Sequence, residues 1–156
     1  MSGNQLFAHR YREVAIRTAN PIQLIVMLYD AAICSIQEAR EQIDHKDIEG
    51  RSRSINRCIS IISELQSCLD RNAGGEIARS LDRLYDYMKR RIFRANVEQS
   101  VQPLAEIEAL LENLRSAWKE LAKDTSASTN GKEVPNRRIS GSAPSTEQSK
   151  SLNISI

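Results

Sequence analysis

The residues best suited to chemistry in this chain are its two histidines, its three cysteines and one cluster of basic side chains. Di-iron carboxylate bundles require a glutamate three positions before a histidine on two helices. Here Leu6 precedes His9 and Gln42 precedes His45 at that spacing, so the ligand pattern is absent. Histidine phosphotransfer needs an exposed histidine in the middle of a helix, whereas His45 falls at a predicted helix end and His9 precedes the predicted bundle. We therefore interpret both histidines as solvated surface residues.

The cysteines Cys34, Cys58 and Cys68 lie in separate apolar stretches and form no C-x-x-C pair. Zinc sites and redox motifs depend on such closely spaced pairs. A cysteine inside an apolar helix behaves as a small hydrophobic residue. We therefore interpret all three as buried, reduced thiols of a cytosolic protein, and we expect no metal site.

The densest basic cluster is Lys89-Arg90-Arg91 with Arg94. It falls in the last turns of a predicted helix, where cations suit the helix dipole, so we interpret it as a solvated charged face. Residues 1–122 contain equal numbers of basic and acidic side chains, which argues against nucleic acid as a partner. The chain also lacks the glycine-rich loops that bind phosphate and the G-x-S-x-G elbow that presents a nucleophile. The sequence thus predicts a protein that is not an enzyme, without catalytic residues or cofactors.

The composition favours a single helical domain. The chain has 156 residues, of which 4% are aromatic, with six Gly and four Pro. Residues 1–17 contain no continuous apolar segment of the kind that a signal peptide needs. No apolar run approaches the roughly 18 residues of a membrane span. We therefore expect a cytosolic protein without membrane insertion.

Four stretches have the apolar spacing of amphipathic helices. They are expected at residues 20–44, 47–71, 76–96 and 100–122. Asn20-Pro21 places a capping residue before a proline at the first helical position, and Gly74-Gly75 ends the second helix. Pro103 is tolerated in the first turn of the fourth helix. Four helices of similar length joined by short loops predict an all-α, antiparallel up-down-up-down four-helix bundle.

The segments on either side of the bundle differ in character. Residues 1–19 contain apolar side chains that we expect to lie against the bundle as an N-terminal cap segment: Leu6, Phe7, Tyr11, Val14 and Ile16. Residues 20–122 form the bundle domain. Residues 123–156 are rich in Ser and Thr and contain few large apolar residues. Such a segment cannot bury enough surface to offset its conformational entropy, so the sequence predicts a disordered tail.

The first two predicted helices carry more apolar surface than a single core stripe uses. On a helical wheel their apolar arcs span about 200° and about 180°, where a surface helix needs somewhat more than 100°. Either each helix contacts two neighbours in the bundle, or a second apolar groove on the outside binds a partner helix. At the margin of the first arc, Ile22, Val26 and Ile33 are expected to be spared by the core and to line such a groove.

Three groups of residues form a pattern whose spacing is intact from residue 11 to about residue 120. They are Thr18-Ala19-Asn20-Pro21 with Leu24-Ile25 and Met27-Leu28-Tyr29-Asp30; Gly74-Gly75-Glu76-Ile77-Ala78 with Leu84-Tyr85-Asp86-Tyr87-Met88 and Arg90-Arg91-Ile92; and Ala95-Asn96, Glu106-Ile107-Glu108, Leu110-Leu111 and Ala117-Trp118-Lys119. This pattern resembles the FliS family of flagellin-specific export chaperones. Ala31 departs from the glycine that is frequent in the family at that position, and the family pattern does not account for the Ser-rich tail.

The resemblance implies a helical bundle in the bacterial cytosol that binds the disordered C-terminal segment of flagellin. Binding would prevent premature polymerisation and keep the subunit competent for type III flagellar export, and the complex would pass to the flagellar export gate. In the family, the N-terminal segment occupies part of the groove in the free protein, and Tyr11 matches its tyrosine there. The alternative is a non-secretory regulatory adaptor that docks a helix of another cytosolic protein. Whether the free protein forms a homodimer stays open.

The candidate partner-binding residues combine the N-terminal segment, the apolar margins of the first two helices and the tyrosine block. They are Tyr11, Ile16, Ile22, Ile25, Val26, Tyr29, Ile33, Ile55, Ile59, Ile62, Tyr85 and Met88. For Tyr85 and Tyr87 a second interpretation stays open, in which both are tyrosines at the core edge with satisfied hydroxyl groups.

Overall fold

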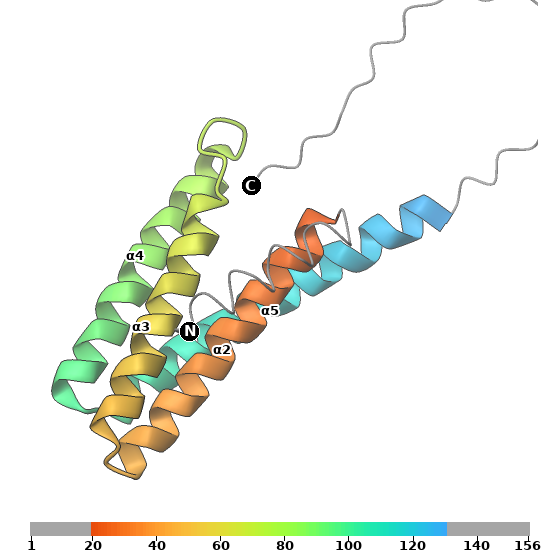
Figure 1. Ribbon diagram of the computed structural model, residues 1–156. Coiled ribbons are helices and arrows are strands. Elements are labelled where there is room, and N and C mark those ends of the chain that lie inside the picture. Colours follow the sequence, from red (N-terminus) through yellow and green to blue (C-terminus); the bar gives the residue numbers. More distant parts are fainter. Residues whose placement is uncertain (1–19, 131–156) are drawn as a thin grey trace, which may run out of the picture.

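The computed structural model describes residues 20–130, which fold into four helices (Figure 1). These are α2 (Pro21–Asp44), α3 (Ile48–Ser67), α4 (Gly75–Glu98) and α5 (Val101–Asn130). α2 packs against α3 and α5, and α4 packs against the same two helices, so the helices follow their chain order around the bundle. Successive helices run antiparallel (Figure 1). The prediction of an all-α, up-down-up-down four-helix bundle is confirmed.

Local sequence signals set the start of the first two helices. The backbone of Asn20 is extended, and its side-chain oxygen accepts a hydrogen bond from the Ile22 amide at 3.1 Å. Pro21 follows at the first helical position, where its missing amide is not needed. Asp47 caps α3 in the same way by accepting a hydrogen bond from the Gly50 amide at 2.9 Å.

The second helix ends four residues before the expected Arg71. α3 stops at Ser67, and the side chain of Asp70 then accepts hydrogen bonds from the amides of Asn72 and Ala73, both at 2.9 Å. These bonds stabilise a turn instead of another helical turn. Gly74 is required there, because a Cβ atom at that residue would lie 2.6 Å from the Cβ of Ala78.

The fourth helix continues eight residues past the expected end at Ala122, as far as Asn130. The expectation that the tail begins at residue 123 is therefore wrong for residues 123–130. Hydroxyl groups inside this extension bond back to the helix, as when Thr125 Oγ1 donates to the Leu121 carbonyl at 2.9 Å. Residues 123–128 are all exposed, so the extension adds nothing to the core. The expected cap segment 1–19 and the tail beyond residue 130 lie outside the described residues.

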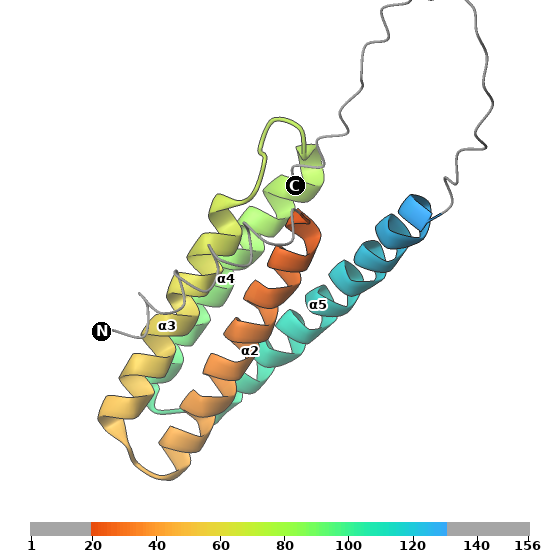
Figure 2. The same cartoon turned by 45° about the vertical axis from the view of Figure 1, so that its right-hand side comes forward.

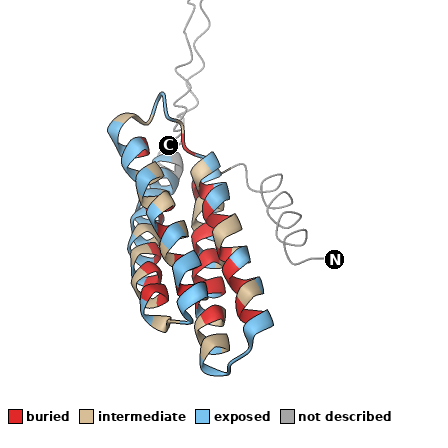
Figure 3. Cartoon of the chain, turned by 90° about the vertical axis from the view of Figure 1, so that its left-hand side faces the viewer, coloured by how far each residue is buried: buried red, intermediate tan, exposed pale blue. Residues whose placement is uncertain are grey.

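The core lies along the bundle axis, where the inward faces of all four helices are buried (Figure 3). Near its centre the hydroxyl groups of Tyr29 on α2 and Tyr85 on α4 are 2.5 Å apart and hydrogen-bonded. Burial raises the pKa of both tyrosines, so both stay neutral at physiological pH. Also on α2, Arg40 and Gln37 donate hydrogen bonds to the buried carboxylate of Glu108 on α5, the latter at 2.8 Å.

α2 is, among the described helices, the one long and apolar enough to cross a membrane by length and composition alone. The expectation that no apolar run approaches such a length is therefore wrong. In this structure α2 is a core helix, because its buried residues pack against α3 and α5. A core helix meets the same criterion as a membrane span when its neighbours in the bundle are apolar.

Candidate partner-binding surface

Most of the predicted partner-binding residues lie in the core. Fully buried, with at most 1% of the side chain exposed, are five of them: Tyr29, Ile55, Ile62, Tyr85 and Met88. Tyr85 therefore matches its second interpretation, a core tyrosine whose hydroxyl group has a partner. Tyr87 lies at the surface, 36% exposed, and its hydroxyl group donates to Glu106 on α5.

Ile22 and Ile33 are also core residues, each only 4% exposed. The expectation that the core spares them is wrong. The reason is that α2 packs against α3 on one side and α5 on the other, which uses both margins of its apolar arc. Val26, Ile25 and Ile59 are half-buried and pack against the core. Tyr11 and Ile16 lie outside the described residues.

A large apolar hollow lies instead between α4 and α5. We call it the α4–α5 groove; it has a volume of about 500 Å³ and is lined by Ala73, Gly74, Ile77, Leu81, Leu114, Ala117, Trp118 and Leu121. Two of its large apolar side chains face solvent, because Ile77 is 70% and Leu121 is 40% exposed. A second hollow of about 290 Å³ shares Ile77 and Leu81 and extends along α4 to Leu84. A groove with these walls suits the apolar face of a helix from a partner.

The groove exists because α4 and α5 diverge. Both views show the two helices close together at the turn that joins them and separated toward the start of α4 (Figures 1 and 2). At the closed end, Arg91 of α4 forms an ion pair with Glu106 of α5 at 2.6 Å, and Tyr87 bonds to the same carboxylate. The hydrogen bonds from Tyr87 and Arg91 lower the pKa of Glu106 and keep it charged. Polar contacts therefore hold the helices together at one end and leave apolar surface at the other.

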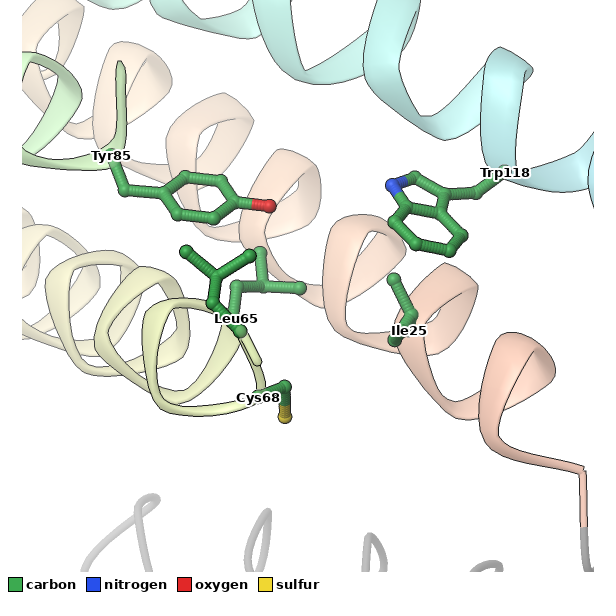
Figure 4. Close-up of a pocket in the computed structure, with 6 residues that line it drawn as sticks. Ile25, Leu65, Cys68, Tyr85 and Trp118 are labelled. Carbon is green, nitrogen blue, oxygen red and sulfur yellow. The ribbon is translucent and has the colours of Figure 1, made fainter. Parts of the chain in front are cut away.

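Trp118 forms the boundary between the groove and the core. It lines the groove and also a cavity of about 10 Å³, together with side chains from α2, α3 and α4. Figure 4 shows Trp118 beside Ile25 of α2, with the Tyr85 hydroxyl group directed toward the same space. Trp118 itself is only 8% exposed. A ligand in the groove would therefore rest on a rigid aromatic wall backed by core residues.

The groove residues of α5 are absent from the predicted site residues because their spacing is that of a helix face packed in the bundle core. Leu114, Trp118 and Leu121 continue the apolar repeat that begins at Leu104. Periodicity identifies an apolar face but does not tell whether a neighbouring helix covers it. One signal was present: Ile77 stands alone among the polar residues Glu76, Arg79 and Ser80 at the start of α4.

Chemical groups elsewhere offer little reactivity. Within residues 20–130 no three His, Cys, Asp or Glu side chains are placed to hold a metal ion. Of the cysteines only Cys58 is buried, and burial raises the pKa of its thiol to about 12. Cys34 and Cys68 are exposed, so the expectation that all three are buried is wrong. α2 presents Cys34 on its outer face, while Cys68 caps the end of α3.

A helical bundle with an apolar groove and no clustered reactive groups in its described part defines a protein-binding module. The family model for "Flagellar protein FliS" matches residues 3–125. The flagellar secretion chaperone FliS of Salmonella typhimurium is 38% identical over 126 residues, which is 80% of this chain and 93% of that protein. Its counterpart in Bacillus subtilis is 34% identical over 110 residues, 70% of this chain and 81% of that protein. The counterpart in Escherichia coli is 34% identical over 119 residues, 76% of this chain and 88% of that protein.

The chain therefore belongs to the FliS family, whose members are flagellar secretion chaperones. This membership confirms the resemblance found in the sequence, and it favours an export chaperone over an enzyme or a non-secretory adaptor.

Proposed function

We propose that this chaperone works in the cytosol and binds the disordered C-terminal segment of flagellin in the α4–α5 groove. The observation that carries the proposal is the exposed apolar surface of that groove, with Ile77 and Leu121 in contact with solvent. A disordered segment with apolar residues at helical spacing can bury these side chains by folding into a helix on the groove. Family membership supports flagellin as the client, and the apolar walls of the groove support this place for it.

Binding of this kind accounts for both parts of the chaperone's task. A flagellin segment held in the groove has its apolar face covered, so the same face is not available to other flagellin subunits. The residues that line the groove are apolar, so their side chains form no fixed polar contacts with the client, which allows release when the complex reaches the flagellar export gate. The N-terminal residues Tyr11 and Ile16 belong to the same proposal as a segment that covers apolar surface until the client arrives. In the alternative, a second copy of the free chain covers the groove by forming a homodimer.

The proposal is tested with the double substitution Ile77→Ser/Leu121→Ser in the full chain. Each substitution removes roughly 1 kcal/mol of apolar burial from the complex, at about 25 cal/mol per Å². We therefore expect the affinity for a peptide of the flagellin C-terminal segment, measured by calorimetry, to fall about thirtyfold. The same variant should fail to keep flagellin from polymerising in a light-scattering assay.

The matched control is Ile48→Ser, because Ile48 is 61% exposed at the start of α3 and lies outside the groove. It should bind the peptide with unchanged affinity. Both variants should melt within a few degrees of the unmodified chain, since the substituted side chains are exposed. A double variant that melts normally and binds the peptide as tightly as the control would place the client elsewhere on the bundle.

A further inference from the structure

The outward face of α4 carries a row of arginines. Arg79, Arg83, Arg90 and Arg94 are spaced four, seven and four residues apart, so they fall within about 60° of each other on the helix. All four are exposed, and the side chains of Arg79 and Arg94 are 63% and 68% accessible. The sequence alone suggested an undivided basic cluster at residues 89–94. The structure separates it, because Lys89 and Arg91 contact neighbouring helices whereas Arg90 and Arg94 face outward.

Both edges of this face are fixed by contacts with the rest of the bundle. On one edge, Lys89 and Asp86 meet Gln66 of α3 at 2.6 Å and 2.9 Å. On the other edge, Arg91 meets Glu106 of α5 at 2.6 Å. The arginine row lies between these edges on the helical wheel and therefore points away from both neighbouring helices.

Two members of the row are not neutralised by an ion pair with the described residues. Arg79 pairs with Glu76 at 3.5 Å and Arg94 pairs with Glu98 at 2.6 Å. Arg83 and Arg90, by contrast, have no ion pair within residues 20–130. Seven residues separate them, which is about 10.5 Å along the helix axis. The face thus presents two unpaired guanidinium groups two helical turns apart.

Apolar side chains continue the same face toward the end of α4. Phe93 is 61% exposed and Val97 is 66% exposed, and they lie one helical turn apart beside the arginine row. An exposed aromatic residue next to unpaired arginines is a combination that recurs at protein interfaces.

We infer that the outward face of α4 binds an amphipathic helix of a second protein, distinct from the client in the groove. That helix carries two acidic residues seven positions apart, opposite Arg83 and Arg90, with apolar residues opposite Phe93 and Val97. Charge complementarity determines the acidic character, and the single-helix shape of the face favours a helical occupant. An anionic membrane is disfavoured, because Glu76 and Glu98 lie at the two ends of the row and would be repelled by it.

The surface is independent of the α4–α5 groove. Ile77 and Leu81 lie about 130° and about 170° around α4 from the centre of the arginine row. A segment in the groove therefore leaves the row accessible, and the chaperone can hold a client and a second protein at the same time. The inference stands whether or not flagellin is the client.

The test uses the full chain and a designed helical peptide of about 20 residues, with two glutamates seven positions apart and two leucines on the same face. An isomer of identical composition places the glutamates five positions apart, which puts them on different sides of the helix. We expect the first peptide to bind at least about tenfold more tightly than the isomer, by fluorescence anisotropy at low salt. The double substitution Arg83→Glu/Arg90→Glu should remove this preference. If that variant does not fold, Arg83→Gln/Arg90→Gln takes its place and should reduce the preference.

The matched control is Arg53→Glu/Lys119→Glu, which changes the net charge equally on α3 and α5. Among the described residues Arg53 is paired with Glu49 of its own helix, and Lys119 lies one turn beyond Arg115, which contacts Asp30 of α2. This control should keep the preference for the first peptide. Equal binding of both peptides, or loss of the preference in the control, would overturn the inference. So would binding to phosphatidylglycerol vesicles without binding to the peptide, or self-association in sedimentation that the reversal at residues 83 and 90 abolishes.

Discussion

α2 and α4 both have 24 residues, yet they use their apolar side chains in opposite ways. α2 is rich in apolar residues, and of its large ones only Met27 is exposed, at 39%, while the others are buried or half-buried. α4 is rich in charged residues, yet it leaves Ile77, Phe93 and Val97 more than 60% exposed. The more polar of the two helices therefore carries the apolar surface that is available to partners.

The two helices pack against the same neighbours, α3 and α5, so the difference lies in how much of each apolar face those neighbours cover. α2 lies between α3 and α5 along its length, so both of its margins are covered. On α4 a few apolar residues stand among charged ones, at positions where no neighbouring helix covers them. An exposed large apolar residue on an otherwise charged helix is the more informative observation about function.

The contrast is tested most strongly by truncating one isoleucine of each helix. Ile33→Ala removes a buried side chain of α2 and should lower the free energy of unfolding by about 3 kcal/mol, since it leaves a cavity in the core. Ile77→Ala on α4 should change it by less than about 0.5 kcal/mol. Urea titrations that give the midpoint and slope for each variant make the comparison. Equal losses in the two variants would mean that Ile77 contributes to the core and that the groove is closed.

A smaller effect is expected where the two helices meet, at the Tyr29–Tyr85 hydrogen bond. Tyr29→Phe leaves the buried Tyr85 hydroxyl group without that partner and should cost about 1 to 2 kcal/mol of unfolding free energy. The double variant Tyr29→Phe/Tyr85→Phe should cost less than the sum of the two single changes, because it leaves neither hydroxyl group unpaired. Additive losses in the thermal or urea data would show that the two hydroxyl groups do not interact.

The smallest effect concerns the closed end of the α4–α5 interface and depends on pH. Tyr87 and Arg91 lower the pKa of Glu106 in the folded protein, so its stabilising contribution is present above the unfolded pKa, about 4.3. This contribution is lost as the pH falls through the lower folded pKa. We therefore expect Glu106→Gln to melt below the unmodified chain at pH 7 and to approach it at about pH 3. The exposed Glu112 of the same helix provides the control, since Glu112→Gln should leave the melting curves unchanged at both values of pH.

The sequence predicted those features that depend on neighbouring residues in the chain. Asn20 caps α2, Gly74-Gly75 lies at the junction between α3 and α4, and the repeats predicted four antiparallel helices. The candidate site was not predictable in the same way. Ile22 and Ile33 have the same residue type and spacing whether they face a groove or a neighbouring helix, and only the packing of α5 on α2 distinguishes the two.

What the sequence determined by itself was the number of helices, their antiparallel order and the start of α2, because capping, turn formation and apolar periodicity are local properties. The tertiary structure decided which apolar faces stay open. The divergence of α4 from α5 depends on how side chains of all four helices pack together, and it leaves Ile77 and Leu121 exposed at one end while Arg91 and Glu106 close the other. Whether a groove forms depends on the separation between two helices, and the apolar spacing within either helix does not determine that separation.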